Sequence, residues 1–116
     1  MIVNNRMTTY IHSLESPESP LLEQIEQEAL AGYVPIIRKE TQSFLKVLVM
    51  MKQPSRILEI GTAVGFSALL LSEYMPKGGQ ITTIEKYEKR IPVARENFRR
   101  AGKEDQITLI EGDALE

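Results

Sequence analysis

Near its middle the chain reads Arg56-Ile57-Leu58-Glu59-Ile60-Gly61-Thr62-Ala63-Val64-Gly65. The first five of these residues form a short aliphatic run with the length and composition of a β-strand. The next five form a turn with a glycine at each end, and glycine lets a backbone approach a ligand without a clash at Cβ. In a doubly wound α/β sheet, this first strand-to-helix turn is where a nucleotide-like ligand binds.

The residues after this turn alternate between helix and strand patterns. The sequence predicts a helix over 66–74, a strand over 80–84, a helix over 87–100 and a strand over 106–110. Both later strands are rich in β-branched residues, which favour extended structure. Strand, helix, strand, helix, strand is a βαβαβ unit, so we expect an α/β fold with a parallel sheet and right-handed crossovers.

The residues before the first strand predict helices. These helices cover 7–14, 20–31 and 40–52. Ser19 can cap the second helix and Gly32 can close it. We therefore divide the chain into an N-terminal helical segment, residues 1–54, and an α/β part, residues 55–116. The helical segment is expected to act as a cap or as an oligomer contact.

Composition narrows the chemistry that the chain can perform. Its 116 residues carry a net charge of −2, and 42% of them are hydrophobic, as in one globular domain. The chain has no cysteine, which excludes disulfides, thiol catalysis and cysteine-based zinc sites. The apolar runs are far shorter than the roughly 20 residues that span a bilayer, and residues 1–10 lack an apolar signal core. We therefore expect a cytoplasmic protein without a membrane anchor.

Half of the positive charge lies on one predicted helix and the residues that flank it. Seven of the 14 basic residues fall between residues 86 and 103. They form either an ordinary solvated helix face or a patch that binds RNA or an acidic ligand. Tyr87 and Phe98 are the aromatic residues in this stretch, too few for a platform on which single-stranded bases stack.

Acidic residues follow the second and third predicted strands. Glu85 comes 24 residues after Gly61, where a carboxylate can accept hydrogen bonds from both ribose hydroxyls or simply favour the start of the next helix. Asp113 follows the third strand, where it could bind an adenine amino group or belong to an ordinary Gly-Asp turn. Because Ala63 replaces the middle glycine of the dinucleotide fingerprint, the turn fits a pyrophosphate poorly. Together these residues indicate an adenosine-binding edge without a pyrophosphate cradle.

With these residues the chain resembles the class I S-adenosylmethionine (SAM)-dependent methyltransferases, and within them the catechol and caffeoyl-CoA O-methyltransferase family. The segments that carry the resemblance are 37–45, 58–67, Glu85 and 111–114. It covers about residues 30–116. The N-terminal helices and residues 33–37 are most similar to the bacterial branch that methylates 5-hydroxyuridine in the tRNA anticodon loop.

The resemblance implies a Rossmann-like, doubly wound parallel sheet of seven strands, of which this chain would hold the first three. In the family's strand order, 3-2-1-4-5-7-6, the strand over 56–60 is central, so Ile57, Leu58 and Ile60 are expected to be buried on both faces. Without a fourth strand beside it, this strand would be an open edge.

The resemblance also implies SAM as cofactor, and the expected cofactor-binding residues are Ile37, Glu59, Gly61, Ser67, Glu85, Asp113 and Ala114. Glu59 and Gly61 would lie near the methionine end, and Ser67 would hold its carboxylate. Glu85 would bind the ribose, whereas Asp113 and the Ala114 amide would read the adenine. Ile37 would contact the cofactor from the segment before the first strand, or be an ordinary residue of the hydrophobic core. Ser67 could instead be an ordinary serine that caps backbone donors in a first helical turn.

Enzymes of this family use a divalent metal, usually Mg²⁺, to orient and activate the acceptor hydroxyl. Its ligands are expected beyond residue 116, so we assign no catalytic residue and no metal ligand to this chain, and His12 reads as a surface or packing residue. The 116 residues by themselves are expected to be inactive.

The acceptor would be 5-hydroxyuridine in tRNA or a small catechol-like molecule, and the enzyme a homodimer. The alternative from another class is a non-catalytic βαβ interaction module.

Overall fold

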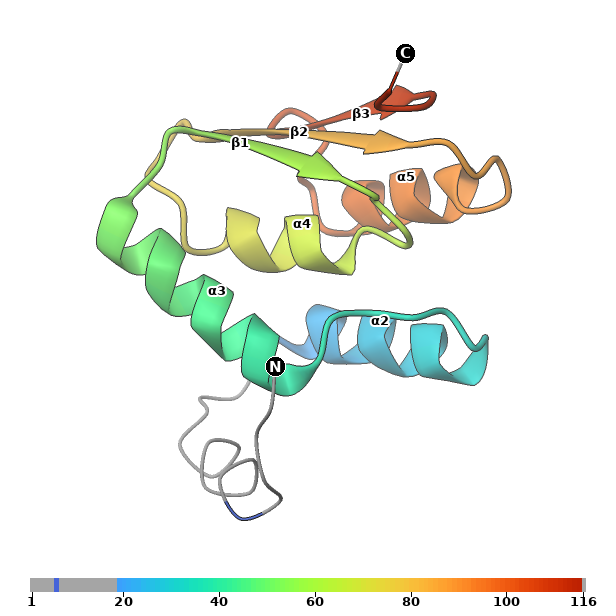
Figure 1. Ribbon diagram of the computed structural model, residues 1–116, viewed down its shortest axis with the longest axis horizontal. Helices are drawn as coiled ribbons and strands as arrows, with labels where there is room; N and C mark the ends of the chain where they lie inside the picture. The colour runs from blue at the N-terminus through green and yellow to red at the C-terminus, as the bar shows by residue number, and fades with distance from the viewer. Residues whose placement is uncertain (1–5, 7–18, 116) are drawn as a thin grey trace.

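A computed structural model describes Arg6 and residues 19–115 (Figure 1). Its elements are α2 (Pro20–Ala31), α3 (Lys39–Lys52), β1 (Arg56–Ile60), α4 (Phe66–Ser72), β2 (Gln80–Glu85), α5 (Ile91–Arg100) and β3 (Ile107–Glu111). The helix predicted over residues 7–14, with His12, lies outside the described residues. All the other predicted helices and strands are present, so the βαβαβ prediction is confirmed.

The three strands form a parallel sheet in the order β1-β2-β3. Ile57 pairs with Ile81, and Ile81 pairs with Ile107, so all three strands run side by side from their first residues. The carboxyl ends of the strands therefore meet at one edge of the sheet. This order matches the 3-2-1 half of the expected methyltransferase sheet.

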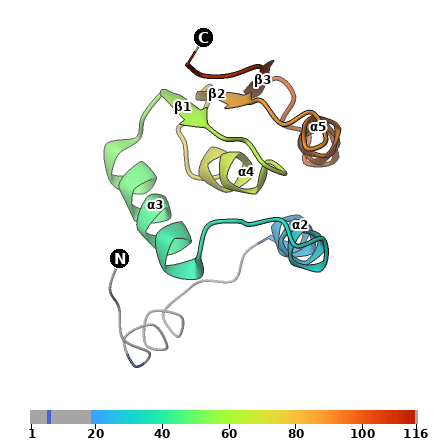
Figure 2. The same ribbon diagram turned by 45° about the vertical axis from the view of Figure 1, so that its right-hand side comes forward.

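The helices lie on one side of the sheet. Figures 1 and 2 show α4 and α5 beneath the strands, with α2 beneath those two helices and α3 slanting down from the amino end of β1. Helix α4 lies between the sheet and the N-terminal helices, and its residues are buried on all sides except at Ser67. A short helix that is apolar all round suits this middle layer.

Burial alternates along the strands because only one face of the sheet is covered by described elements. Ile81, Ile107 and Leu109 point into the core. Leu58 and Ile60 point the other way and are 64% and 70% exposed. The expectation that these two residues are buried on both faces is therefore wrong for the described chain, because no described helix packs on that face.

The observed bounds differ from the predicted ones mainly at α5. This helix begins at Ile91 rather than at residue 87, since Pro92 fits only the first turn of a helix. Helix α4 ends at Ser72, two residues earlier than predicted. The cap of α2 is confirmed, because the Leu22 amide donates to Ser19 Oγ at 3.3 Å.

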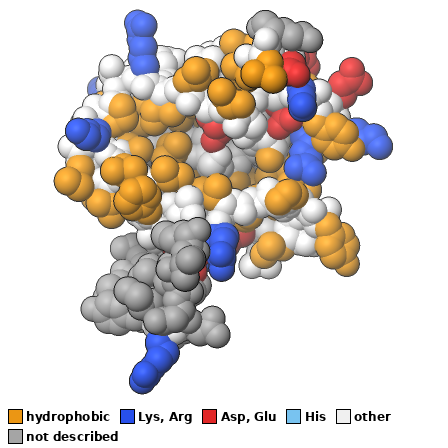
Figure 3. All heavy atoms as spheres, viewed as in Figure 1, with side chains coloured by type: hydrophobic (Ala, Val, Ile, Leu, Met, Phe, Trp, Pro, Cys, Tyr) orange, Lys and Arg blue, Asp and Glu red, His pale blue; other side chains and the backbone are white. Residues whose placement is uncertain are grey.

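A second group of exposed apolar side chains lies on α3. Phe44, Val47, Met50 and Met51 are each more than half exposed. Figure 3 shows hydrophobic side chains gathered on the side of the molecule that α3 occupies. Among the described helices, none is both long enough and apolar enough to cross a lipid bilayer.

We expect a polypeptide of these 116 residues to self-associate, because the open face of the sheet exposes apolar side chains and β1 is an unpaired edge. Replacing Leu58 by Lys should weaken the association about tenfold, the scale of keeping one leucine in water. Sedimentation velocity at tens of micromolar measures this. Gln27→Lys adds the same charge at an exposed position on α2 and should change nothing, and a cooperative monomer for the unmodified sequence would contradict the prediction.

Candidate functional site

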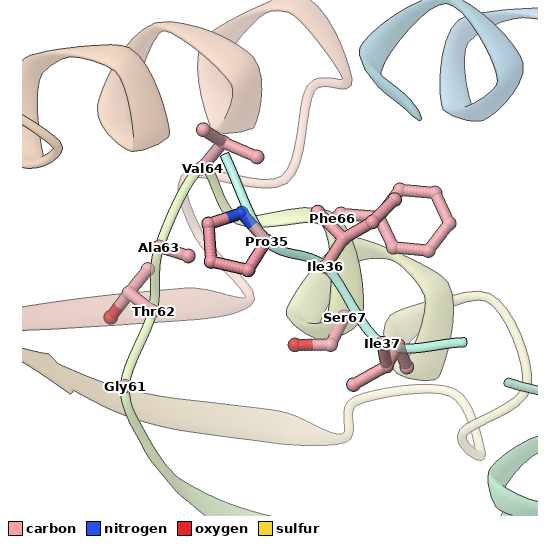
Figure 4. Close-up of a pocket in the computed structure, with 9 residues that line it drawn as sticks. All are labelled: Pro35, Ile36, Ile37, Gly61, Thr62, Ala63, Val64, Phe66 and Ser67. Carbon is pink, nitrogen blue, oxygen red and sulfur yellow. The ribbon is translucent and has the colours of Figure 1, made fainter. Parts of the chain in front are cut away.

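A cavity of about 220 Å³ lies where β1 ends and α4 begins (Figure 4). Its lining residues are Pro35, Ile36, Ile37, Gly61, Thr62, Ala63, Val64, Phe66 and Ser67. The segment between α2 and α3 crosses over the glycine turn and supplies the first three of them. The structure thus brings together three of the predicted site residues, Ile37 from the segment before α3 and Gly61 and Ser67 from the stretch that joins β1 to α4.

The two glycines of the turn have different roles. Both have positive φ, +92° at Gly61 and +89° at Gly65. A Cβ built on Gly61 would meet nothing within 4 Å, so its backbone is open to a ligand. A Cβ built on Gly65 would lie 2.5 Å from the Phe98 ring, so this glycine allows close packing against α5. The ligand and packing interpretations of the motif therefore apply to different glycines.

Helix α5 holds the turn from behind through Asn97. This side chain is 3% exposed, and its Nδ2 donates to the Val64 carbonyl at 2.8 Å. Arg100 donates to Asn97 Oδ1 at 2.9 Å and to Glu28 of α2 at the same distance, so the turn is linked to the N-terminal helices. Asn97 was not among the predicted site residues, although its place on the buried stripe of the helix, between Ala94 and Phe98, could have indicated it.

The Glu85 carboxylate organises two loops. Oε1 accepts a hydrogen bond from the Ala63 amide at 2.7 Å, and Oε2 accepts from the amides of Lys86 and Tyr87 at 3.1 and 3.0 Å. These amides belong to the loop before α5, because that helix begins only at Ile91. An ionised carboxylate offers about four acceptor positions, so three amides leave room for one further donor.

Glu59 lies beside the cavity in a more enclosed place. Thr83 donates to its Oε1 at 2.8 Å, and the Ser67 hydroxyl donates to its Oε2. Burial raises the pKa of Glu59 above its ordinary value, the two hydroxyl hydrogen bonds oppose that rise, and the charge of Glu85 adds to it. Ser67 thus has a carboxylate as its partner, a contact that the sequence analysis did not foresee.

Asp113 and Ala114 lie on the same edge of the sheet but outside this cavity. The Gly112 amide donates to the Glu85 carbonyl at 2.8 Å, which ties the end of β3 to the end of β2. Asp113 Oδ1 accepts from the Leu115 amide at 2.9 Å, a local turn contact. Of the predicted methionine-end residues, Gly61 and Ser67 line the cavity and Glu59 is hydrogen-bonded to Ser67, whereas the predicted ribose and adenine residues follow the next two strands.

Several of the basic residues over 86–103 have acidic partners. Arg95 lies 3.8 Å from Glu111, Arg99 lies 2.5 Å from Glu96, and Arg100 lies 2.9 Å from Glu28. These pairs neutralise part of the positive charge on α5. They favour a solvated helix face over a continuous surface for a polyanion.

Acidic side chains do not gather into a cation site in the part of the chain that the structure describes. No group of three or more His, Asp or Glu residues there could hold a metal ion. Mg²⁺ requires several oxygen ligands around one position. The described residues thus do not fit a magnesium site by themselves.

Comparison with known proteins places this geometry in a family. Residues 11–116 match the model of a family described as O-methyltransferase. The chain is 40% identical over 73 residues to a catechol O-methyltransferase of Mycobacterium tuberculosis and 36% identical over 73 residues to one of Niastella koreensis. Each match covers 63% of this chain and 33% of the relative, so the chain spans about a third of the length of these curated relatives.

A solved structure shares the same arrangement of elements. The O-methyltransferase of Bacillus cereus, crystallised with S-adenosylhomocysteine (SAH), has a TM-score of 0.82 to this chain at 31% identity. The similarity covers 95% of this chain and 51% of the Bacillus protein. The predicted Rossmann-like methyltransferase fold is therefore confirmed.

We expect Gly65→Ala to lower the free energy of unfolding by about 2–4 kcal/mol, since the new methyl group meets the Phe98 ring and the residue keeps a left-handed backbone. Gly78→Ala is the matched control, because Gly78 has φ +83° but open space around its Cβ position. It should cost only about 1–2 kcal/mol, the backbone part of the effect. Urea unfolding measures both, and equal losses would show that contact with Phe98 does not matter.

Proposed function

Since the chain belongs to the O-methyltransferase family, we propose that it forms the cofactor-binding part of an enzyme that transfers a methyl group from SAM to a hydroxyl group. The observation that carries the proposal is the cavity at Gly61, where open backbone lies next to Ile37 and Ser67. A ligand seated there would touch both the glycine turn and the first turn of α4. The SAH bound in the Bacillus relative supports the same choice of cofactor.

The residues fit the amino-acid end of SAM at this cavity. SAM carries an ammonium, a carboxylate and a sulfonium, and its methyl group passes in line to an oxygen nucleophile. Because the Ser67 hydroxyl donates to Glu59, Ser67 would hold the carboxylate through its backbone amide in the first turn of α4, and Glu59 would face the ammonium. Ile37 would cover the cofactor from the segment above the turn, and Gly61 would let it approach the backbone.

The adenosine part would extend along the strand ends. Glu85 has acceptor capacity left for a ribose hydroxyl after binding three amides. Asp113 and the amide of Ala114 would read the adenine beyond it. The described residues position and orient the cofactor in this proposal, and they hold no group for activating the acceptor.

For the acceptor we propose 5-hydroxyuridine in tRNA, because residues 33–37 and the N-terminal helices resemble that branch of the family. A small catechol-like molecule is the second candidate. It is favoured by the names of the two bacterial relatives and by the ion pairs that neutralise part of the basic helix. We further propose that residues beyond 116 hold Mg²⁺, and that the enzyme is a homodimer in the cytoplasm.

The acceptor can be decided with the complete gene product that contains this chain. The protein is incubated with SAM labelled in its methyl group, Mg²⁺, and either tRNA carrying 5-hydroxyuridine or a catechol. Methylation of tRNA that falls steeply with rising salt supports the first acceptor, because phosphate contacts are sensitive to salt. Methylation of catechol alone supports the second. If SAH binds and neither acceptor is methylated, both proposed acceptors are wrong. If SAH does not bind, the result supports the alternative that the protein is a non-catalytic interaction module.

We expect Glu85→Gln to weaken SAH binding by about 1.5–3 kcal/mol, since a charge-assisted hydrogen bond to a ribose hydroxyl is lost. Calorimetry on the complete gene product measures the affinity, and thermal unfolding of the same variant shows whether the two loops stay in place. Glu104→Gln removes the same charge from an exposed position at the far end of the sheet and should leave binding unchanged. If Glu85→Gln leaves the SAH affinity unaltered, Glu85 does not bind the cofactor and only holds the two loops whose amides it accepts.

A further inference from the structure

A row of hydroxyl groups leads from the interior of the fold to Glu59. Thr62 and Thr83 are 1% and 0% exposed, and their Oγ1 atoms lie 2.6 Å apart. Thr83 stands directly opposite Glu59 in the β1–β2 register and donates to its Oε1 at 2.8 Å. The row therefore runs from Thr62 through Thr83 to the carboxylate.

The direction of these hydrogen bonds follows from counting protons. Each threonine hydroxyl has one proton to donate. Thr83 gives its proton to Glu59, so the short contact between the two threonines is made by the proton of Thr62. The other carboxylate oxygen accepts from Ser67, so both oxygens of Glu59 are held by hydroxyl donors from two different elements.

We propose that Thr83 is a positioning residue for the cofactor: backed by Thr62, it holds the Glu59 carboxylate beside the cavity so that this charge meets the ammonium group of SAM. The inference rests on the proposed function, since it needs a cofactor in this cavity. Thr83 itself is fully buried and does not line the cavity. It acts only through Glu59, and that sets it apart from the residues that would contact SAM.

The hydrogen bond from Thr83 matters because the surroundings of Glu59 work against its charge. Burial raises the pKa of this carboxyl, and Glu85, the described titratable group that acts on it from the end of β2, raises it further. The hydroxyls of Ser67 and Thr83 favour the ionised form. Removing the Thr83 hydroxyl therefore raises the pKa of Glu59. At a given pH, a larger fraction of the variant molecules than of the wild type then carries a protonated, neutral Glu59 carboxyl.

The test uses Thr83→Val, which keeps the shape of the side chain and removes its hydroxyl, in the complete gene product. SAH affinity is measured by calorimetry from about pH 5 to pH 8, the range in which a raised carboxyl pKa would appear. We expect about a tenfold loss of affinity, the scale of one hydrogen bond to a charged group, and a midpoint of the pH dependence shifted upward. Thr83→Ser should restore both quantities to within about twofold.

Two further variants complete the test, one at a second position in the row and one as a matched control. Thr62→Val breaks the row one step farther from Glu59, so it should shift the pKa of Glu59 in the same direction by a smaller amount. Because Thr62 also lines the cavity, this variant is measured in the cofactor-free protein. Thr108→Val makes the same change at an exposed site on β3 and should leave both quantities unchanged. Because Thr62→Val weakens the row without changing Thr83, the proposal stays testable even if Thr83→Val folds poorly.

A second measurement separates this inference from the function beneath it. A carbon NMR titration of the Glu59 carboxyl in the cofactor-free protein should give a higher pKa in Thr83→Val than in the wild type or in Thr83→Ser. An unchanged pKa overturns the proposal, as does a raised pKa with unaltered SAH affinity, and either result leaves the methyltransferase assignment standing. A wild-type protein that binds no SAH overturns the cofactor assignment, and the proposal with it.

Discussion

The hydrogen bond from the Ala63 amide to the Glu85 carboxylate joins the ends of β1 and β2 into one edge. Oε2 of the same carboxylate binds the amides of Lys86 and Tyr87, so one side chain shapes both loops that a nucleoside would meet. Ala63 has a left-handed backbone, with φ +50°, which is uncommon for a residue other than glycine. A strong acceptor for its amide helps to hold it there. The glycine turn, the cavity and the position of Ser67 all depend on this arrangement.

Most of the fold was predictable because its signals are local. The aliphatic run at 56–60, the β-branched strands and the Ser19 cap each depend on a few neighbouring residues, and the structure contains all of them. The start of α5 was predicted four residues too early, because nothing in the sequence shows that the amides of Lys86 and Tyr87 donate to the Glu85 carboxylate. The exposure of Leu58 and Ile60 depends on which elements cover the sheet, and that is not a local property.

The placement of the predicted site residues along one edge of the sheet was predictable, whereas their contacts were less so. Parallel strands place their carboxyl ends together, so Gly61, Glu85 and Asp113 could be assigned to one edge from spacing alone. The contact between Ser67 and Glu59 could not be foreseen, because it depends on how α4 sits against β1. Asn97 and the pair of buried threonines were missed for the same reason, since their partners come from elements far apart in the sequence.

The pairing of Glu59 with Thr83 also bears on how the sheet finds its alignment. Parallel strands rich in aliphatic residues offer few cues against sliding, because one aliphatic residue packs much like the next. A slip of two residues would set Glu59 opposite Ile81, which leaves a partly buried carboxylate without its donor, or opposite Glu85, which sets two carboxylates face to face. A slip of one residue would turn Thr83 to the opposite face. The polar group that we place beside the ligand thus also penalises misaligned pairings while the chain folds.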